Sequence, residues 1–229
     1  MNLIERPLPN ESEKIREDVL EVLGTLVHKL SQPLTSLRGS VEVALMGQII
    51  ESEFRQVLEQ SLEESRRMTE IIRMLRDVLE MEGPDGDIQP VLWRQSVEKS
   101  LKEAEFGDRH CRLRLVCDVA DEVRVKASPQ HLDTATRRLI GRVLKAAPGN
   151  HEVRIGLSVR GEAACLSICA KSLPCETLEP GDVDWWIIHR AVERQGGWLA
   201  ISGVPETGRC YQLYLPLEPS EGAGKPRTL

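Results

Sequence analysis

The chain has 229 residues, of which 41% are hydrophobic and 29% are charged, and this balance is typical of a soluble folded protein. Its net charge of -6 has the wrong sign for a general binder of nucleic acids or of anionic membranes. We therefore expect protein partners or small ligands, with no nucleic acid and no membrane among them.

The N-terminal residues carry no apolar run of signal-peptide length, and no stretch approaches the roughly 20 apolar residues of a membrane span. We expect a cytoplasmic protein. Only about ten residues precede the first predicted helix, so signals are expected to arrive through a partner. The six cysteines form no Cys-x-x-Cys pair, and several alternate with apolar residues as the core positions of strands do. We expect reduced core thiols rather than metal ligands or disulfides.

The first third of the chain predicts two long helices. Its apolar residues recur in alternating steps of four and three, the pattern of a helix that packs lengthwise on another. We call the row of residues along which such a helix contacts its neighbour the seam. In the first helix, 11–46, the seam consists of Val19, Leu23, Leu26, Leu30, Pro33, Leu37, Val41 and Ala44. In the second helix, which ends at Gly83 and Pro84, it consists of Phe54, Leu58, Ser61, Ser65, Met68, Ile72, Leu75 and Leu79.

The short connection around Gly47 makes the two helices an antiparallel hairpin. Each helix also carries apolar residues that flank the seam, and these are Val22, Val57, Leu62, Ile71 and Val78. One hairpin cannot bury all of them, whereas two hairpins that meet as a four-helix bundle would. The first predicted domain, residues 1–83, is therefore expected to form a homodimer.

A linker rich in Gly, Pro and Asp over 82–89 separates the hairpin from a second predicted domain at 90–218. Helices are predicted at 91–105, 129–147 and 184–195, and strands at 111–117, 153–159, 164–170, 198–202 and 212–217. Ser128 is the expected N-cap before Pro129, and Gly196 with Gly197 ends the last helix. The fold class is α+β, a helical hairpin followed by an α/β sandwich with helices on one sheet face. Residues 219–229 are expected to be a disordered tail.

His28 is the leading candidate for chemistry. It stands two positions from both Leu26 and Leu30, so at about 100° per residue it points roughly 200° away from the seam and is expected to be exposed. Pro33 removes a backbone hydrogen bond to Lys29 and should bend the helix just beyond the imidazole. An exposed imidazole keeps a free ring nitrogen that can attack a phosphoryl group. On these features alone, a solvated surface residue is the simpler interpretation.

The string from His28 to Gly39, His-Lys-Leu-Ser-Gln-Pro-Leu-Thr-Ser-Leu-Arg-Gly, resembles the H-box of sensor histidine kinases, especially the variety with Gln-Pro-Leu after the histidine. The resemblance covers the hairpin. The second predicted domain resembles the ATP-binding domain of the same kinases in outline, through its order of helices and strands and through Gly196 and Gly197. This resemblance implies a dimeric hairpin that carries a phosphoryl group on His28.

The chain departs from the family pattern where the kinase chemistry needs particular side chains. The residue after the phosphorylated histidine is usually acidic and helps to deprotonate it, but here it is Lys29. The magnesium-binding asparagine of the family would fall near Arg142, and a guanidinium cannot hold a cation. The adenine-reading aspartate would fall at Ala170, and a glycine of the same box at Ser172.

The next glycine-rich box is replaced by Asp-Val-Asp-Trp-Trp at 182–186. Asp182 and Asp184 stand at a helix start, where a phosphate would bind, and Trp185 and Trp186 fill the space that glycines leave open. The segment 172–182 is also too short for the usual ATP lid. We therefore expect no nucleotide, no metal and no other cofactor.

Two function classes remain. The first is a histidine phosphotransferase that exchanges a phosphoryl group with response-regulator receiver domains. In it His28 is the nucleophile, Lys29 offsets phosphoryl charge, and Gln32 hydrogen-bonds a phosphoryl oxygen or a water. The second is a non-catalytic pseudokinase, a scaffold or regulator of a partner kinase, with Trp185 and Trp186 as its contact site. A third hypothesis is an autokinase whose nucleotide pocket is altered.

Overall fold

The structure is a computed structural model, and it describes residues 11–47, 51–84, 86–105, 113–115, 123–147, 152–170, 173, 182–204 and 208–218. The chain divides into two compact units, Met1–Glu82 and Gly83–Leu229. The tail expected at 219–229 lies outside the described residues. Among the residues that are described, no helix is both long enough and apolar enough to cross a membrane.

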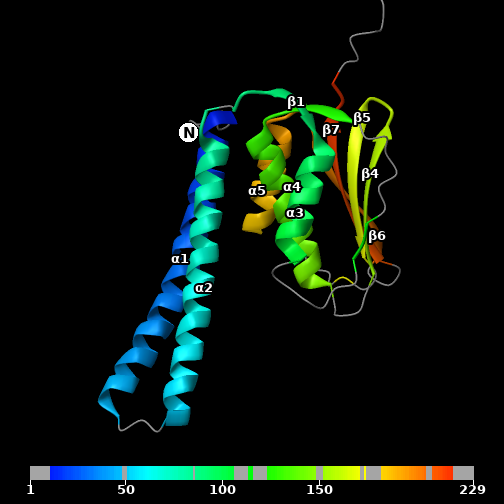
Figure 1. Cartoon of the computed structure of the whole chain (residues 1–229). Helices are drawn as coiled ribbons and strands as arrows, with labels where there is room; N and C mark the ends of the chain where they lie inside the picture. Colours follow the sequence, from blue (N-terminus) through cyan, green and yellow to red (C-terminus); the bar gives the residue numbers. More distant parts are fainter. Residues whose placement is uncertain are drawn as a thin grey trace, which may run out of the picture. The chain divides into compact units, whose positions relative to one another are not determined.

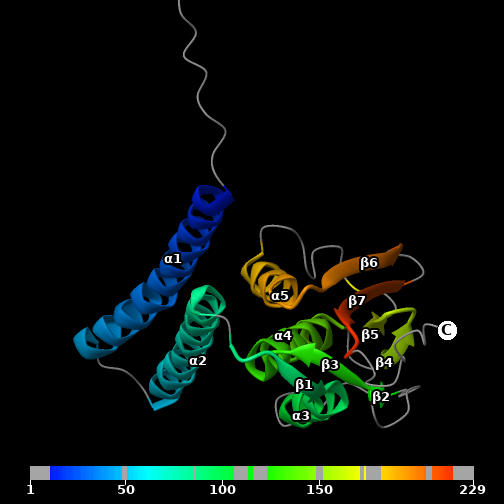
Figure 2. The ribbon, with the colours of Figure 1, turned by 90° about the horizontal axis from the view of Figure 1, so that it is seen from above.

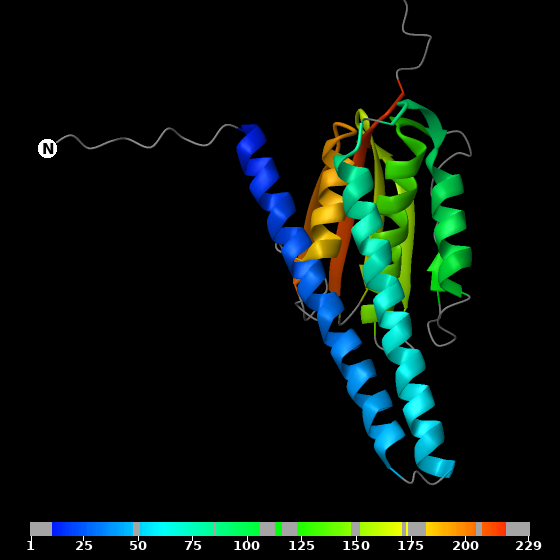
Figure 3. The ribbon, with the colours of Figure 1, turned by 90° about the vertical axis from the view of Figure 1, so that its left-hand side faces the viewer.

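The first unit is a hairpin of two helices, α1 (Glu11–Met46) and α2 (Glu51–Glu82). They run in opposite directions, as the short connection predicts (Figures 1 and 3). Helix α1 continues through Pro33, whose ring is buried, and Leu26 on the predicted seam is only 2% exposed. The hairpin prediction is therefore confirmed.

The seam of α2 lies on a different stripe from the one predicted. Phe54, Leu58, Ile72 and Leu79 are exposed. The less accessible positions, which repeat in the same alternating steps, are Val57, Ser61, Glu64, Met68, Ile71, Leu75 and Val78. The prediction was wrong because α2 carries two neighbouring apolar stripes that share Ser61, Met68 and Leu75. Periodicity alone does not decide which stripe faces α1.

The second unit contains three helices, α3 (Trp93–Glu105), α4 (Pro129–Ala146) and α5 (Val183–Glu193). Its strands are β1 (Gln89–Leu92), β2 (Leu113–Leu115), β3 (Arg124–Ala127), β4 (Val153–Arg160), β5 (Ala163–Ala170), β6 (Trp198–Val204) and β7 (Gly208–Pro216). The main sheet has the order β2-β4-β5-β7-β6, with β2 and β4 parallel and the other pairs antiparallel. A separate antiparallel pair, β1 and β3, was not predicted, and Val91 and Leu92 of β1 were wrongly expected to begin the helix at 91–105.

The three helices lie on one face of the main sheet (Figures 1 and 2). Alternate strand residues such as Ile155, Leu166 and Leu213 are buried, and so are Leu139 of α4 and Ile187 of α5. The predicted α/β sandwich with helices on one face is confirmed. We call the opposite face, which carries Arg154, Cys169 and Cys210, the outer face of the sheet.

The end of α5 shows why the paired glycines are required. Gly196 has a φ of +70°, a left-handed conformation that side chains disfavour. A Cβ on Gly197 would lie 2.2 Å from the carbonyl oxygen of Tyr214. The helix ends at Glu193, two residues before the predicted Gln195, and the glycines then allow the chain to enter β6.

The cysteines correct one expectation. Cys165 is a buried free thiol, as predicted, but Cys169 and Cys210 form a disulfide. The pairing arises because the two residues are direct neighbours on β5 and β7, which the sequence separation of 41 residues does not reveal. Cys111, Cys117 and Cys175 lie outside the described residues.

Candidate functional site

His28 is exposed on α1, as its position away from the seam predicts. Gln32 follows four residues later and therefore stands on the same helix face. Its Nε2 lies 3.4 Å from Nε2 of His28. Of the three site residues predicted on the hairpin, the structure thus places His28 and Gln32 in direct contact.

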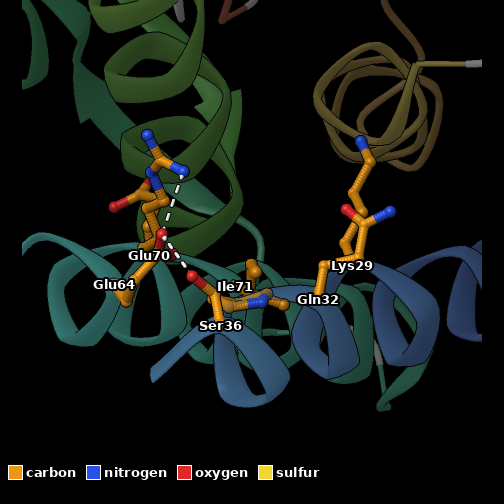
Figure 4. A pocket seen from close by; sticks show the side chains of 8 residues that line it. Lys29, Gln32, Ser36, Glu64, Glu70 and Ile71 are labelled. Atoms are coloured by element: carbon orange, nitrogen blue, oxygen red, sulfur yellow. Dashed lines mark hydrogen bonds and ion pairs between the residues drawn. The ribbon is translucent and has the colours of Figure 1, made fainter. Parts of the chain in front are cut away.

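A groove of about 450 Å³ runs beside this pair, between α1 and α2. It is lined by Lys29, Gln32, Pro33 and Ser36 from α1 and by Glu64, Arg67, Glu70 and Ile71 from α2 (Figure 4). The side chains of Lys29 and Gln32 project next to each other. Lys29, the third predicted residue, lines this groove.

A carboxylate is buried beneath this groove. Glu64 is only 8% exposed, and its Oε1 accepts a hydrogen bond of 3.4 Å from Oγ of Ser36 (Figure 4). Nη1 of Arg67 lies 3.5 Å from the same oxygen. Glu64 was not predicted because the seam of α2 was expected on the other stripe, which contains Ser65 in its place. A seam through Ser61 and Met68 in the observed register would have included Glu64.

A second cluster joins α4 to α5 in the α/β unit. Asp182 caps α5, since its Oδ1 accepts a 2.9 Å hydrogen bond from the backbone nitrogen of Asp184. Nη2 of Arg142 lies 2.7 Å from Oδ2 of Asp182, and its Nη1 lies 3.7 Å from Oδ2 of Asp184. Nη1 of Arg138 forms an ion pair with Oδ1 of Asp184. The structure thus brings together three of the predicted positions, Arg142, Asp182 and Asp184.

The charges in this cluster balance, because two arginines face two aspartates. The side chains of Arg138 and Asp184 are only 3% and 9% exposed, so their ion pair is buried. Both carboxylates also stand at the N-terminus of α5, where the helix dipole favours negative charge. Arg138 was missed because its partner lies 46 residues away and only the packing of α4 on α5 brings them together.

The other predicted positions of this site are spread more widely. Ala170 is buried at the end of β5. Trp185 and Trp186 are half-buried, and the ring of Trp185 stacks on His189 with centroids 6.1 Å apart. Ser172 lies outside the described residues. Of the segment 172–182, which was expected to be too short for an ATP lid, the structure describes only Leu173 and Asp182.

The hairpin is similar to a known family of domains. Residues 18–84 match the family described as the His Kinase A (phospho-acceptor) domain. The sensor protein DivL of Caulobacter vibrioides is 25% identical over 237 residues, covering 94% of this chain and 30% of DivL. The phosphate regulon sensor protein PhoR of Pseudomonas aeruginosa is 26% identical over 165 residues, covering 69% of this chain and 36% of PhoR. The chain spans about a third of the length of these relatives.

Solved structures show the same fold over both units. The histidine kinase ThkA, in complex with the response regulator protein TrrA, matches with a TM-score of 0.69 at 15% identity, covering 91% of this chain and 65% of that one. The Acinetobacter baumannii histidine kinase AdeS matches with a TM-score of 0.63 at 17% identity, covering 83% of this chain and 98% of that one. The likeness confirms a helical hairpin followed by an α/β sandwich like the ATP-binding domain of histidine kinases.

Proposed function

We propose that this chain is a histidine phosphotransferase. The chain has the make-up of a two-component histidine kinase, because a segment similar to the His Kinase A phospho-acceptor domain is followed by a kinase-like α/β domain. It exchanges a phosphoryl group between His28 and the receiver domains of response regulators, without binding ATP itself. The observation that carries this proposal is the exposed His28 in a phospho-acceptor domain. The arginine–aspartate cluster in the α/β unit supports the absence of nucleotide.

The transfer step uses a ring nitrogen of His28. We assign it to Nε2, to which the amide of Gln32 donates, so that the ring proton sits on Nδ1. Nε2 attacks the phosphorus of an aspartyl phosphate, the N–P bond forms, and the P–O bond to the receiver carboxylate breaks. The carboxylate leaves with the electron pair of that bond. The ammonium of Lys29, one residue away, offsets the charge of the phosphoryl group.

The arginine–aspartate cluster disfavours a magnesium nucleotide at the positions that the kinase resemblance assigns. Arg142 stands where the family has its magnesium-binding asparagine, and it is engaged with Asp182 at 2.7 Å. A guanidinium has no lone pair for a cation. Asp182 and Asp184 place negative charge at the N-terminus of α5, where a phosphate would otherwise bind. We infer that the α/β domain keeps the kinase fold without the kinase ligand.

The hairpin has the surface of one half of a four-helix bundle, which supports a homodimer. Exposed apolar residues on α1 recur every seven positions at Leu20, Val27, Leu34 and Val41. Those on α2 are Phe54, Leu58, Leu62, Ile72 and Leu79. A second hairpin would cover both stripes and leave His28 outside. The receiver partner is supported by the ThkA structure, which holds a response regulator protein.

The proposal is tested by labelling the purified protein with radioactive ATP in a lysate of its own cells. Acid-labile label is expected on the wild type and is expected to be lost in His28→Ala. The control is His189→Ala, which removes a histidine on α5 whose side chain is 44% exposed. Equal label on wild type and His28→Ala would overturn the proposal.

The half-buried Trp185 and Trp186 favour a second candidate function, a scaffold that binds a partner kinase or regulator. In that case His28 is dispensable. Unchanged signalling output in cells that carry His28→Ala would select the scaffold. Loss of output there, with output kept in a Trp185→Ala variant, would select phosphotransfer.

A binding measurement distinguishes an autokinase from both the phosphotransferase and the scaffold. We expect equilibrium dialysis with labelled ATP and magnesium to show no saturable binding at micromolar concentrations. Saturable binding would overturn the absence of nucleotide, and would leave His28 as the acceptor of the protein's own kinase activity.

A further inference from the structure

Cys169 and Cys210 form a cross-strand pair in the middle of the main sheet. They are register partners on β5 and β7, and their Cα atoms lie 4.0 Å apart. This separation is closer to the roughly 4.5 Å of a non-hydrogen-bonded antiparallel pair than to the roughly 5.5 Å of a hydrogen-bonded pair. Side chains at such positions stand close together on the same face. The two sulfurs can therefore bond or separate without a change in strand register.

The pair lines a cavity that also contains charged side chains. A cavity of about 230 Å³ on the outer face is lined by both cysteines and by Glu152, Arg154 and Arg209. Both cysteines are half-buried, so a small oxidant can reach them. Among the described residues of this lining, Oε1 of Glu152 lies 2.7 Å from Nε of Arg154. The thiolate is the form of a cysteine that reacts with oxidants.

Cys165 provides an internal contrast on the same strand. It is fully buried, and burial raises the pKa of its thiol, while a hydrogen bond with Tyr214 opposes that rise. A buried thiol with a raised pKa has little thiolate and reacts slowly. Strand β5 thus carries a buried cysteine that reacts slowly, Cys165, and an accessible cysteine, Cys169, four residues apart.

We propose that Cys169 and Cys210 are a reversible thiol–disulfide couple, a site of oxidation by peroxides on the outer face of the sheet. One thiolate attacks an oxygen of the peroxide, so that an S–O bond forms, the O–O bond breaks, and hydroxide leaves with the electron pair of that bond. The hydroxide takes up the proton that the thiol lost and becomes water, and the cysteine is then a sulfenic acid. The second thiol then attacks the sulfenic sulfur, the S–S bond forms, and a second water leaves. Two thiols lose two electrons, and hydrogen peroxide takes up both electrons and both protons to become two waters.

The disulfide connects the strands that precede and follow α5 and β6 in the chain. The cross-link joins β5 to β7 and closes a segment of the chain that contains α5. Helix α5 carries Asp184 of the arginine–aspartate cluster, together with Trp185 and Trp186. The S–S bond thus adds a covalent link to a strand pair that is already hydrogen-bonded from Ala163 to Ala170.

The test uses the full chain. It is reduced with dithiothreitol, freed of reductant, treated with hydrogen peroxide, and alkylated under denaturing conditions before digestion with trypsin. Cleavage after Arg160 and Lys171 leaves Cys165 and Cys169 in one peptide, so fragment ions must show which cysteine is linked. We expect a peptide linked through Cys169 and Cys210, with loss of two hydrogen atoms, and alkylated Cys165. Dithiothreitol added to the folded, oxidised protein should return both thiols.

Two results would overturn the proposal. One is that Cys169 and Cys210 stay alkylated at peroxide concentrations that oxidise other cysteines of the chain. The other is a link that survives dithiothreitol in the folded protein, which would make it a permanent structural bond. A variant sharpens the test, because Cys210→Ser should trap a sulfenic acid on Cys169 that dimedone labels. Its control, Cys165→Ser, should leave the linked fraction unchanged.

Discussion

Gln32 and His28 form the smallest unit of the proposed mechanism. They stand one helical turn apart on an exposed face of α1, with the two Nε2 atoms 3.4 Å apart. The amide can orient the imidazole, and it can also hydrogen-bond a water that attacks a phosphorylated receiver. We therefore propose that this one side chain serves both transfer through His28 and hydrolysis on a bound receiver.

Removing this amide should slow the hydrolysis more than the transfer. In Gln32→Ala, we expect the dephosphorylation rate of a bound receiver to fall about tenfold, the equivalent of one hydrogen bond of roughly 1.4 kcal/mol. The measurement is phosphate release from a labelled receiver. The matched control is Gln60→Ala, which removes an exposed amide on α2. Equal rates for wild type and Gln32→Ala would exclude this role.

At the scale of single residues, His28, Lys29 and Gln32 could be named from the sequence as candidate site residues because all three belong to one local motif, and their roles stay predictions. It could not predict Arg138, whose carboxylate partner Asp184 lies 46 residues away. Nor could it predict the disulfide, because alternation of Cys169 and Cys210 with apolar residues is equally compatible with core thiols. Contacts between distant segments depend on strand register and helix packing, which local patterns do not contain.

At the scale of elements, the buried ion pair between α4 and α5 makes a stability prediction. Asp184→Asn leaves the Arg138 guanidinium buried with less compensating charge, so the free energy of unfolding should fall by about 3 kcal/mol or more. Urea unfolding followed by circular dichroism measures this loss. The double variant Arg138→Met with Asp184→Leu should be less destabilised than Asp184→Asn, since no charge remains uncompensated in that pair.

A solvent-exposed ion pair provides the control for this measurement. Glu152 and Arg154 lie 2.7 Å apart with side chains 43% and 65% exposed, and Glu152→Gln should change the unfolding free energy by less than about 1 kcal/mol. A loss in Asp184→Asn no larger than in Glu152→Gln would show that the arginine–aspartate cluster does not hold α4 to α5.

The helices and strands themselves were largely predictable, but which face of a helix is buried was not. Both hairpin helices and all three helices of the α/β unit were predicted, because each has a clear apolar period or end signal. Strands β1 and β3 were missed because each has only four residues, too few for alternation to be distinctive. The seam of α2 was misplaced because the second apolar stripe, which includes Leu58 and Ile72, follows the same period.

At the scale of the whole molecule, the exposed stripe on α1 predicts dimerisation. Val27→Glu places a charge in the middle of the stripe, and burying that charge between two hairpins is unfavourable. We expect the dimer dissociation constant to rise at least about tenfold, which corresponds to a loss of roughly 1.4 kcal/mol. Analytical ultracentrifugation measures it.

Val43→Glu is the matched control for the dimer, because Val43 is also exposed on α1 but lies off the seven-residue repeat of the stripe. It should leave the dimer intact. If both variants dissociate to the same extent, or if the wild type is a monomer at micromolar concentrations, the four-helix bundle is excluded.

The central claim concerns the whole chain, a phospho-acceptor that takes its phosphoryl group from a partner and not from ATP bound to itself. The most direct measurement follows the label on His28 over time, with the purified wild type and labelled ATP alone in one sample and with cell lysate added in the other. We expect acid-labile label only in the sample with lysate. Label that appears on His28 at the same rate without lysate would contradict the claim, because the protein would then phosphorylate itself.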